Sequence, residues 1–130
     1  MSDVSYLPMP DADELELATV LEALADPVRL QIVAALAPGE RPCGSFPLPV
    51  SDSTRSLHLR ILREAGVTRT RLSGTQRLVA LRRDDLERRF PGLLGSVLAA
   101  SAAGRPSQRR PRPARPRATT SEVADGTGQW

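Results

Sequence analysis

The sequence predicts a small, mainly α-helical fold with one β-hairpin. Apolar residues recur at helical spacing in the first half of the chain and again near residue 90. Between residues 67 and 81 the pattern becomes β-biased. The 130 residues are 40% hydrophobic and 25% charged, as in an ordinary globular protein. We therefore expect one domain with about five helices and a two-stranded hairpin.

Two helices are expected in the first third of the chain. Asp13 and Glu16 have the spacing of a capping box, and Asp26 followed by Pro27 is a specific signal for a second helix start. The first apolar stripe consists of Leu17, Val20, Leu21 and Leu24. The second consists of Val28, Leu30, Ile32, Val33 and Leu36, and the pair Pro38-Gly39 ends that helix.

A third long helix is expected at residues 51–65. Four prolines between residues 38 and 50 allow at most one short helical turn, near residues 44–48. The following residues that can cap the helix N-terminus are Ser51, Asp52, Ser53 and Thr54. Gly66 suits a left-handed C-terminal residue, so the helix ends there.

A hairpin and a broken helix follow. Residues 67–72 and 75–81 flank the turn pair Ser73-Gly74, which predicts the hairpin. Asp84 or Asp85 can cap a further helix, which Pro91-Gly92 should interrupt. Its apolar residues are Leu86, Phe90, Leu93, Leu94, Val97 and Leu98.

These elements suggest three segments. Residues 1–12 contain two prolines and no periodicity, which predicts a flexible lead. Residues 13–101 form the folded domain. Residues 102–130 are rich in Arg and Pro and have too few apolar side chains to offset the entropy of ordering, so we expect a disordered tail.

Composition excludes several classes of protein. No apolar run approaches the roughly 18 residues of a membrane helix, and the N-terminus lacks the pattern of a secretory signal. The single cysteine, Cys43, excludes an internal disulfide framework and a multi-thiolate metal site. We expect a cytoplasmic protein with no membrane contact.

Charge is distributed unevenly along the chain. Residues 1–28 carry seven acidic residues and no basic one, whereas residues 29–100 carry twelve arginines and six acidic residues. All 18 basic residues are arginine. A basic body after an acidic start favours a polyanionic partner, and solvated charged faces are the alternative.

The order of elements is that of a winged helix-turn-helix with a two-stranded wing. Small polar residues near the start of the 51–65 helix can approach base edges in the major groove of double-stranded DNA, and a basic hairpin suits phosphates. The candidate DNA-binding residues are Ser53, Thr54, Arg55, Ser56, Leu57, His58, Arg60, Arg69, Arg71, Ser73 and Arg77. His58 equally fits packing on the side of the helix.

Three stretches resemble one known family. Residues 24–33, LADPVRLQIV, resemble the opening motif of ArsR/SmtB-type transcriptional regulators, and residues 51–67, SDSTRSLHLRILREAGV, resemble their recognition helix. Residues 82–86 and 89–94 are similar to the end of one subgroup. The resemblance implies a winged-helix repressor that binds a near-palindromic operator as a homodimer, through helices at residues 14–25 and 85–100.

The family's metal-sensing pattern is absent from this sequence. Metal-sensing members carry a C-x-C motif where this chain has Cys43 alone, and no histidine follows His58. We therefore expect no metal site and no cofactor. An unknown small-molecule or redox effector is left open.

Two alternatives to an operator-binding repressor remain. One is a winged helix used for protein contacts without specific DNA binding, which the acidic Asp52 favours. The other is a redox-responsive regulator with Cys43 as the candidate sensor, since Arg41 nearby could lower the pKa of a thiol. We do not expect an enzyme, because the sequence has no phosphate loop, metal cluster or paired catalytic carboxylates.

Overall fold

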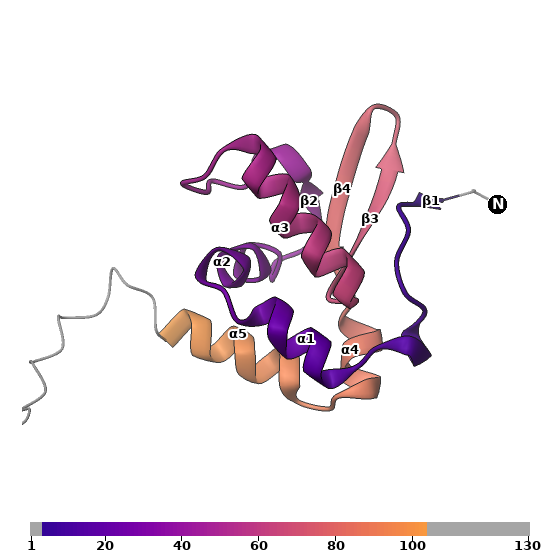
Figure 1. Ribbon diagram of the computed structural model, residues 1–130, viewed down its shortest axis with the longest axis vertical. Coiled ribbons are helices and arrows are strands. Elements are labelled where there is room, and N and C mark those ends of the chain that lie inside the picture. The colour runs from indigo at the N-terminus through magenta and orange to yellow at the C-terminus, as the bar shows by residue number, and fades with distance from the viewer. Residues whose placement is uncertain (1–3, 104–130) are drawn as a thin grey trace, which may run out of the picture.

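The computed structural model describes residues 4–103 and confirms a mainly helical fold with a wing (Figure 1). The helices are η1 (Ala12–Glu14), α1 (Leu17–Leu24), α2 (Pro27–Ala35), η2 (Cys43–Ser45), α3 (Asp52–Ala65), α4 (Arg83–Arg89) and α5 (Leu93–Ala103), where η marks a 3-10 turn. The strands are β1 (Ser5–Tyr6), β2 (Arg41–Pro42), β3 (Thr68–Ser73) and β4 (Gln76–Leu81). Within residues 4–103, no helix has both the length and the apolar character needed to cross a membrane.

The sheet is larger than the predicted hairpin. Its order is β1-β3-β4-β2, with every neighbouring pair antiparallel. β3 and β4 form the expected hairpin, but Ser73 pairs with Gln76, so Gly74 and Thr75 make the turn, one residue later than predicted. β1 and β2 have two residues each and were not predicted, because their pairing is decided by the strands they meet.

Helix starts agree with the sequence at α2 and α3 and differ at two other places. The carboxylate of Asp26 caps α2, as predicted, by accepting the backbone N–H groups of Val28 and Arg29 at 3.0 Å. The predicted capping box at residues 13 and 16 is wrong, because the backbone N–H of Asp11 bonds Glu14 at η1 instead. The predicted aspartate cap of α4 is also wrong, since Arg82 precedes that helix.

The N-terminal lead is packed rather than free, which corrects the prediction for residues 1–12 over its described part. The backbone N–H of Leu7 bonds the carbonyl oxygen of Thr70 at 2.9 Å. The carbonyl oxygen of Pro10 accepts from Nη1 of the buried Arg82 at 2.8 Å. These contacts join residues more than 60 positions apart, so local patterns could not predict them. The predicted tail lies outside the described residues except for positions 102 and 103, which continue α5.

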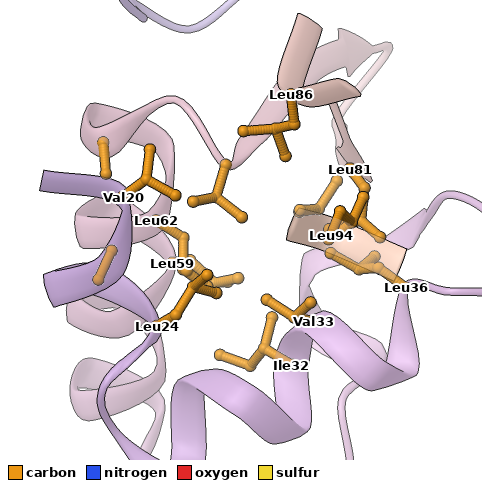
Figure 2. Packing of buried hydrophobic residues seen from close by; sticks show 14 of the residues in the cluster. Val20, Leu24, Ile32, Val33, Leu36, Leu59, Leu62, Leu81, Leu86 and Leu94 are labelled. Carbon is orange, nitrogen blue, oxygen red and sulfur yellow. The ribbon is translucent and has the colours of Figure 1, made fainter. Parts of the chain in front are cut away.

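Helices from both halves of the domain build one apolar core (Figure 2). Its labelled members include Val20 and Leu24 from α1, Leu59 and Leu62 from α3, and Ile32, Val33 and Leu36 from α2 or its end. The apolar stripe predicted for α1 is only partly buried, however, because Leu17 and Leu21 are 47% and 45% exposed. This leaves an apolar face on α1 that the single chain does not cover.

The cap at Asp26 should make stability depend on pH. The hydrogen bond from the backbone amide of Arg29 is the main cause that lowers the pKa of Asp26 below its usual 3.8. A carboxyl with a lower pKa in the folded state stabilises the fold above its unfolded pKa, and this stabilisation is lost as the pH falls through the folded pKa. We expect Asp26→Ala to lower the free energy of unfolding by about 1 kcal/mol at pH 7 and by less in acid.

Urea denaturation at pH 7 and pH 3 measures this difference. Asp26→Asn keeps an uncharged cap and should lose the pH dependence while retaining most of the stability. Asp13→Asn, at an exposed aspartate of η1, is the matched control and should have little effect at either pH. An equal cost of Asp26→Ala at both pH values would contradict the role of the ionised cap.

Candidate nucleic-acid interface

Helix α3 has a capped start and one buried side. The hydroxyl of Ser51 accepts the backbone N–H of Thr54 at 3.2 Å, so among the predicted cap residues Ser51 fills the position. Gly66 ends the helix with a φ of +91°, as predicted. The residues of α3 that lie buried are Leu59, Leu62 and Ala65. Core packing therefore determines which face of α3 points outward.

The outward face begins near the N-terminus of α3. Ser53, Ser56 and Arg60 are exposed, Thr54 is partly exposed, and Leu57 is 46% exposed. Hydroxyl groups can bond base edges or phosphates, and an exposed apolar side chain can contact a thymine methyl group. This face has the chemistry of a surface that can contact base edges in a major groove.

Two of the three arginines of α3 are paired with carboxylates of the same helix. Nη1 of Arg55 bonds Oδ1 of Asp52 at 3.0 Å, and the Arg55 side chain is only 18% exposed. Nε of Arg60 lies 3.9 Å from a carboxylate oxygen of Glu64. Asp52 is 91% exposed, so water screens its pair with Arg55. Arg55 and Arg60 thus have carboxylate neighbours in the absence of a partner, whereas Nε of Arg63 donates to the carbonyl oxygen of Pro8 at 3.2 Å.

His58 does not join the outward face. Its side chain is 14% exposed, with Nδ1 3.2 Å from Nη1 of Arg29 and 3.9 Å from Oδ2 of Asp26. Both neighbours belong to the start of α2. Of the two interpretations of His58, packing on the side of the helix agrees with this geometry.

The three wing arginines predicted to bind DNA lie on two different faces of the hairpin. In a β-strand, alternate side chains lie on opposite faces, and residues paired across an antiparallel ladder share a face. Arg77 pairs with Leu72. On the face of the sheet that they share, the residues farther from the wing tip are buried in the core. Arg69 and Arg71 pair with Ala80 and Leu78 on the opposite face. The exposed Arg77 therefore shares the side of the sheet that packs with α3, and Arg69 and Arg71 do not.

Arg69 and Arg71 have partners on that opposite face. Nε of Arg71 bonds Oε2 of Glu40 at 2.8 Å, and the guanidinium of Arg69 lies 6.0 Å from the ring centre of Tyr6. A shallow hollow of about 230 Å³ lies among these side chains. No sequence signal connects Tyr6 or Glu40 to the wing, because both reach it through tertiary pairing.

Cys43 begins η2 and is half-buried against the core. The guanidinium of Arg41, the cation nearest to it in sequence, donates to Oγ of Ser45 at 3.0 Å and stacks 5.1 Å from the Phe46 ring centre. Across residues 4–103 no three His, Cys, Asp or Glu side chains gather as metal ligands would. The role of Cys43 as a sensor stays a prediction.

The fold agrees with comparisons to known proteins. No family model matches the chain. It is 34% identical over 97 residues to an uncharacterised HTH-type transcriptional regulator, YceK, of Bacillus subtilis, covering 72% of this chain and 97% of YceK. The chain belongs to the ArsR family. A second relative, the biofilm growth-associated repressor of Agrobacterium fabrum, is 34% identical over 95 residues and covers 70% of this chain and 81% of its own.

Solved structures of ArsR-type regulators have the same architecture. A homodimeric winged helix-turn-helix DNA-binding domain from Mycobacterium bovis, a possible ArsR-family regulator, matches with a TM-score of 0.56 and 26% identity, covering 74% of this chain and 87% of that one. The repressor BigR from Xylella fastidiosa matches with a TM-score of 0.54 and 28% identity, covering 71% and 87%. The winged-helix fold is thereby confirmed, and the family is one of transcriptional regulators rather than enzymes.

Proposed function

We propose that this chain is a cytoplasmic, homodimeric repressor that reads a near-palindromic operator with α3. ArsR-family regulators bind operator DNA as homodimers, and two of the similar proteins are named as repressors. The observation that carries the proposal is the outward face of α3, where Ser53, Ser56 and Leu57 are exposed beside a wing that bears Arg77. In this arrangement α3 enters the major groove and the wing meets the backbone or the minor groove beside it.

The proposed DNA surface contains fewer residues than the sequence predicted. Ser53, Thr54, Ser56, Leu57 and Arg60 supply the groove contacts. Nη1 of Arg55 already bonds Asp52, whose negative charge opposes a phosphate beside it. Arg77 supplies a backbone contact from the wing. His58 lies outside this surface, as do Arg69, Arg71 and the exposed Ser73, which share the opposite face of the wing.

The dimer would form through α1 and α5, as the family resemblance implies for residues 14–25 and 85–100. Leu17 and Leu21 lie exposed one turn apart on α1. α5 is apolar around its circumference, which suits a helix covered on both sides. Figure 1 shows α5 at the end of the molecule opposite the hairpin tip, so pairing there would leave the wing free.

Selection from a random duplex library, followed by fluorescence anisotropy, tests the proposal. Specific binding should persist against excess unrelated DNA, and its affinity should fall steeply with salt because arginine–phosphate contacts release counterions. A selected site with two-fold symmetry and half-sites about one helical turn apart would support a dimer. Binding that is equal for all duplexes would contradict the proposal and favour a winged helix that contacts proteins.

The two faces of the wing predict different effects of arginine substitutions. Arg77→Ala should weaken binding about tenfold on every duplex and lower the salt slope by about two per dimer, because each subunit loses one phosphate contact. Arg71→Ala, the matched control, should change affinity by no more than about twofold, since its guanidinium already pairs with Glu40. Anisotropy titrations between low and moderate salt measure both, and a larger effect of Arg71→Ala would contradict this orientation of the wing.

A further inference from the structure

Arg29 contacts two helices besides its own. It lies in the first turn of α2, and its Nε donates to the carbonyl oxygen of Ala23 at 2.6 Å, while Nη2 donates to that of Glu22 at 3.5 Å. Both carbonyls belong to the last turn of α1, and that of Glu22 also accepts the backbone N–H of Ala25 at 3.1 Å. Nη1 lies 3.2 Å from Nδ1 of His58 in the middle of α3. One guanidinium thus connects α1, α2 and α3.

The contact with His58 has a defined direction. A guanidinium can only donate hydrogen bonds, so Nδ1 of His58 must accept and the neutral ring carries its proton on Nε2. Asp26 lies 3.9 Å from Nδ1 and is already bonded to the backbone amides of Val28 and Arg29. The carboxylate balances the charge of Arg29, and the hydrogen bond to His58 is made by Arg29.

The position of this contact matters for a dimer. His58 sits on α3 between the exposed Leu57 and the buried Leu59. Leu59 and Leu62 attach α3 to the core by apolar contacts, whose attraction is non-directional. Hydrogen bonds from a planar guanidinium have a fixed geometry. The bonds of Arg29 therefore define how α3 is oriented relative to α1.

We propose that Arg29 and His58 are positioning residues that fix the orientation of α3 relative to α1, and thereby the distance between the two recognition helices of the dimer. This inference rests on the proposed function, in which α1 contributes to the subunit interface and α3 enters the DNA. A pair with this role decides which half-site spacing is accepted. It does not decide which bases are read.

Half-site spacing is the property to measure. The probe is the highest-affinity duplex from the selection, together with versions that have one base pair added or removed between the half-sites. Each change moves one half-site by about 3.4 Å and rotates it by about 35°. The wild-type protein should bind the altered duplexes at least about thirtyfold more weakly, since two rigidly held helices cannot both dock.

Substitutions at both positions separate the role of the hydrogen bond from that of packing. His58→Leu keeps the bulk but removes the acceptor, and Arg29→Lys keeps the charge but cannot bond Ala23 and His58 together. Both variants should discriminate among spacings by less than about fivefold while keeping the base preference. His58→Asn offers an acceptor near the position of Nδ1 and should restore discrimination to within about threefold of wild type. Gln31→Ala, at an exposed position of α2, is the control and should behave as wild type.

The possible results distinguish a failure of this inference from a failure of the proposed function. Circular dichroism and sedimentation establish that each variant is folded and dimeric, and if His58→Leu is not, Arg29→Lys and His58→Asn decide the matter. If folded, dimeric variants keep the wild-type spacing discrimination, the inference is overturned while the proposed function stands. If the wild-type protein selects no duplex, the proposed function fails first.

Discussion

Gly66→Ala is expected to lower the free energy of unfolding by about 2–5 kcal/mol, enough to leave much of a marginally stable domain unfolded. The backbone φ of Gly66 is +91°, a left-handed conformation that costs a residue with a Cβ about 1–2 kcal/mol. A Cβ at this position would also lie 2.0 Å from Cδ2 of Leu15. Leu15 is 1% exposed and its carbonyl oxygen accepts from Nη2 of Arg89, so it cannot withdraw without disturbing the core.

Substitution of a second glycine separates the cost of the backbone conformation from the cost of the overlap with Leu15. Gly92 also has a positive φ, +82°, but an added Cβ there would meet no atom within 4 Å. Gly92→Ala should therefore show the backbone cost alone, about 1–2 kcal/mol. Urea denaturation followed by circular dichroism gives both values. Equal costs for the two variants would mean that Leu15 moves aside freely, which would contradict the close packing of α3 against the N-terminal segment.

The elements that the sequence predicted correctly are those with local signals. Asp26-Pro27 starts α2 because an aspartate cap and a proline at the first helical position act within one turn. Gly66 ends α3 for an equally local reason. β1 has no such signal, since two residues become a strand only because β3 offers them an edge. The packed N-terminal lead likewise depends on the buried Arg82, 72 positions from Pro10.

The candidate site, too, was predictable only where local signals determine the structure. Ser53 and Leu57 were expected to bind DNA because they lie near the start of the predicted 51–65 helix, and both are exposed on α3. Counting arginines in the wing could not show that Arg77 and Arg71 lie on opposite faces, because this follows from the register of the strands. Nor could it show that Glu40, from outside the hairpin, neutralises Arg71. The charge of a segment therefore overestimates what is free to meet DNA.

Leu17→Asp and Leu21→Asp are expected to dissociate the proposed dimer. Burial of a leucine side chain at an interface contributes about 1.5–3 kcal/mol. In a two-fold symmetric dimer each substitution is present twice, so the loss is about 3–6 kcal/mol before the cost of burying a charge. This corresponds to a dimer dissociation constant raised by about a hundredfold to ten-thousandfold. Operator affinity should fall with it, since each monomer then holds a single half-site.

Sedimentation equilibrium of the variants measures the dissociation constant directly. Val4→Asp is the matched control, because Val4 is 48% exposed, about as much as Leu17 and Leu21, but lies beside β1 and the wing rather than on α1. Val4→Asp should leave the dimer intact. If all three variants stay dimeric, α1 does not contribute to the interface. The hydrogen bonds of Arg29 between α1 and α3 could then not set the distance between the two recognition helices. If only the two α1 variants become monomeric and still bind one half-site weakly, α1 holds the dimer together and the DNA-binding surface lies elsewhere on each subunit.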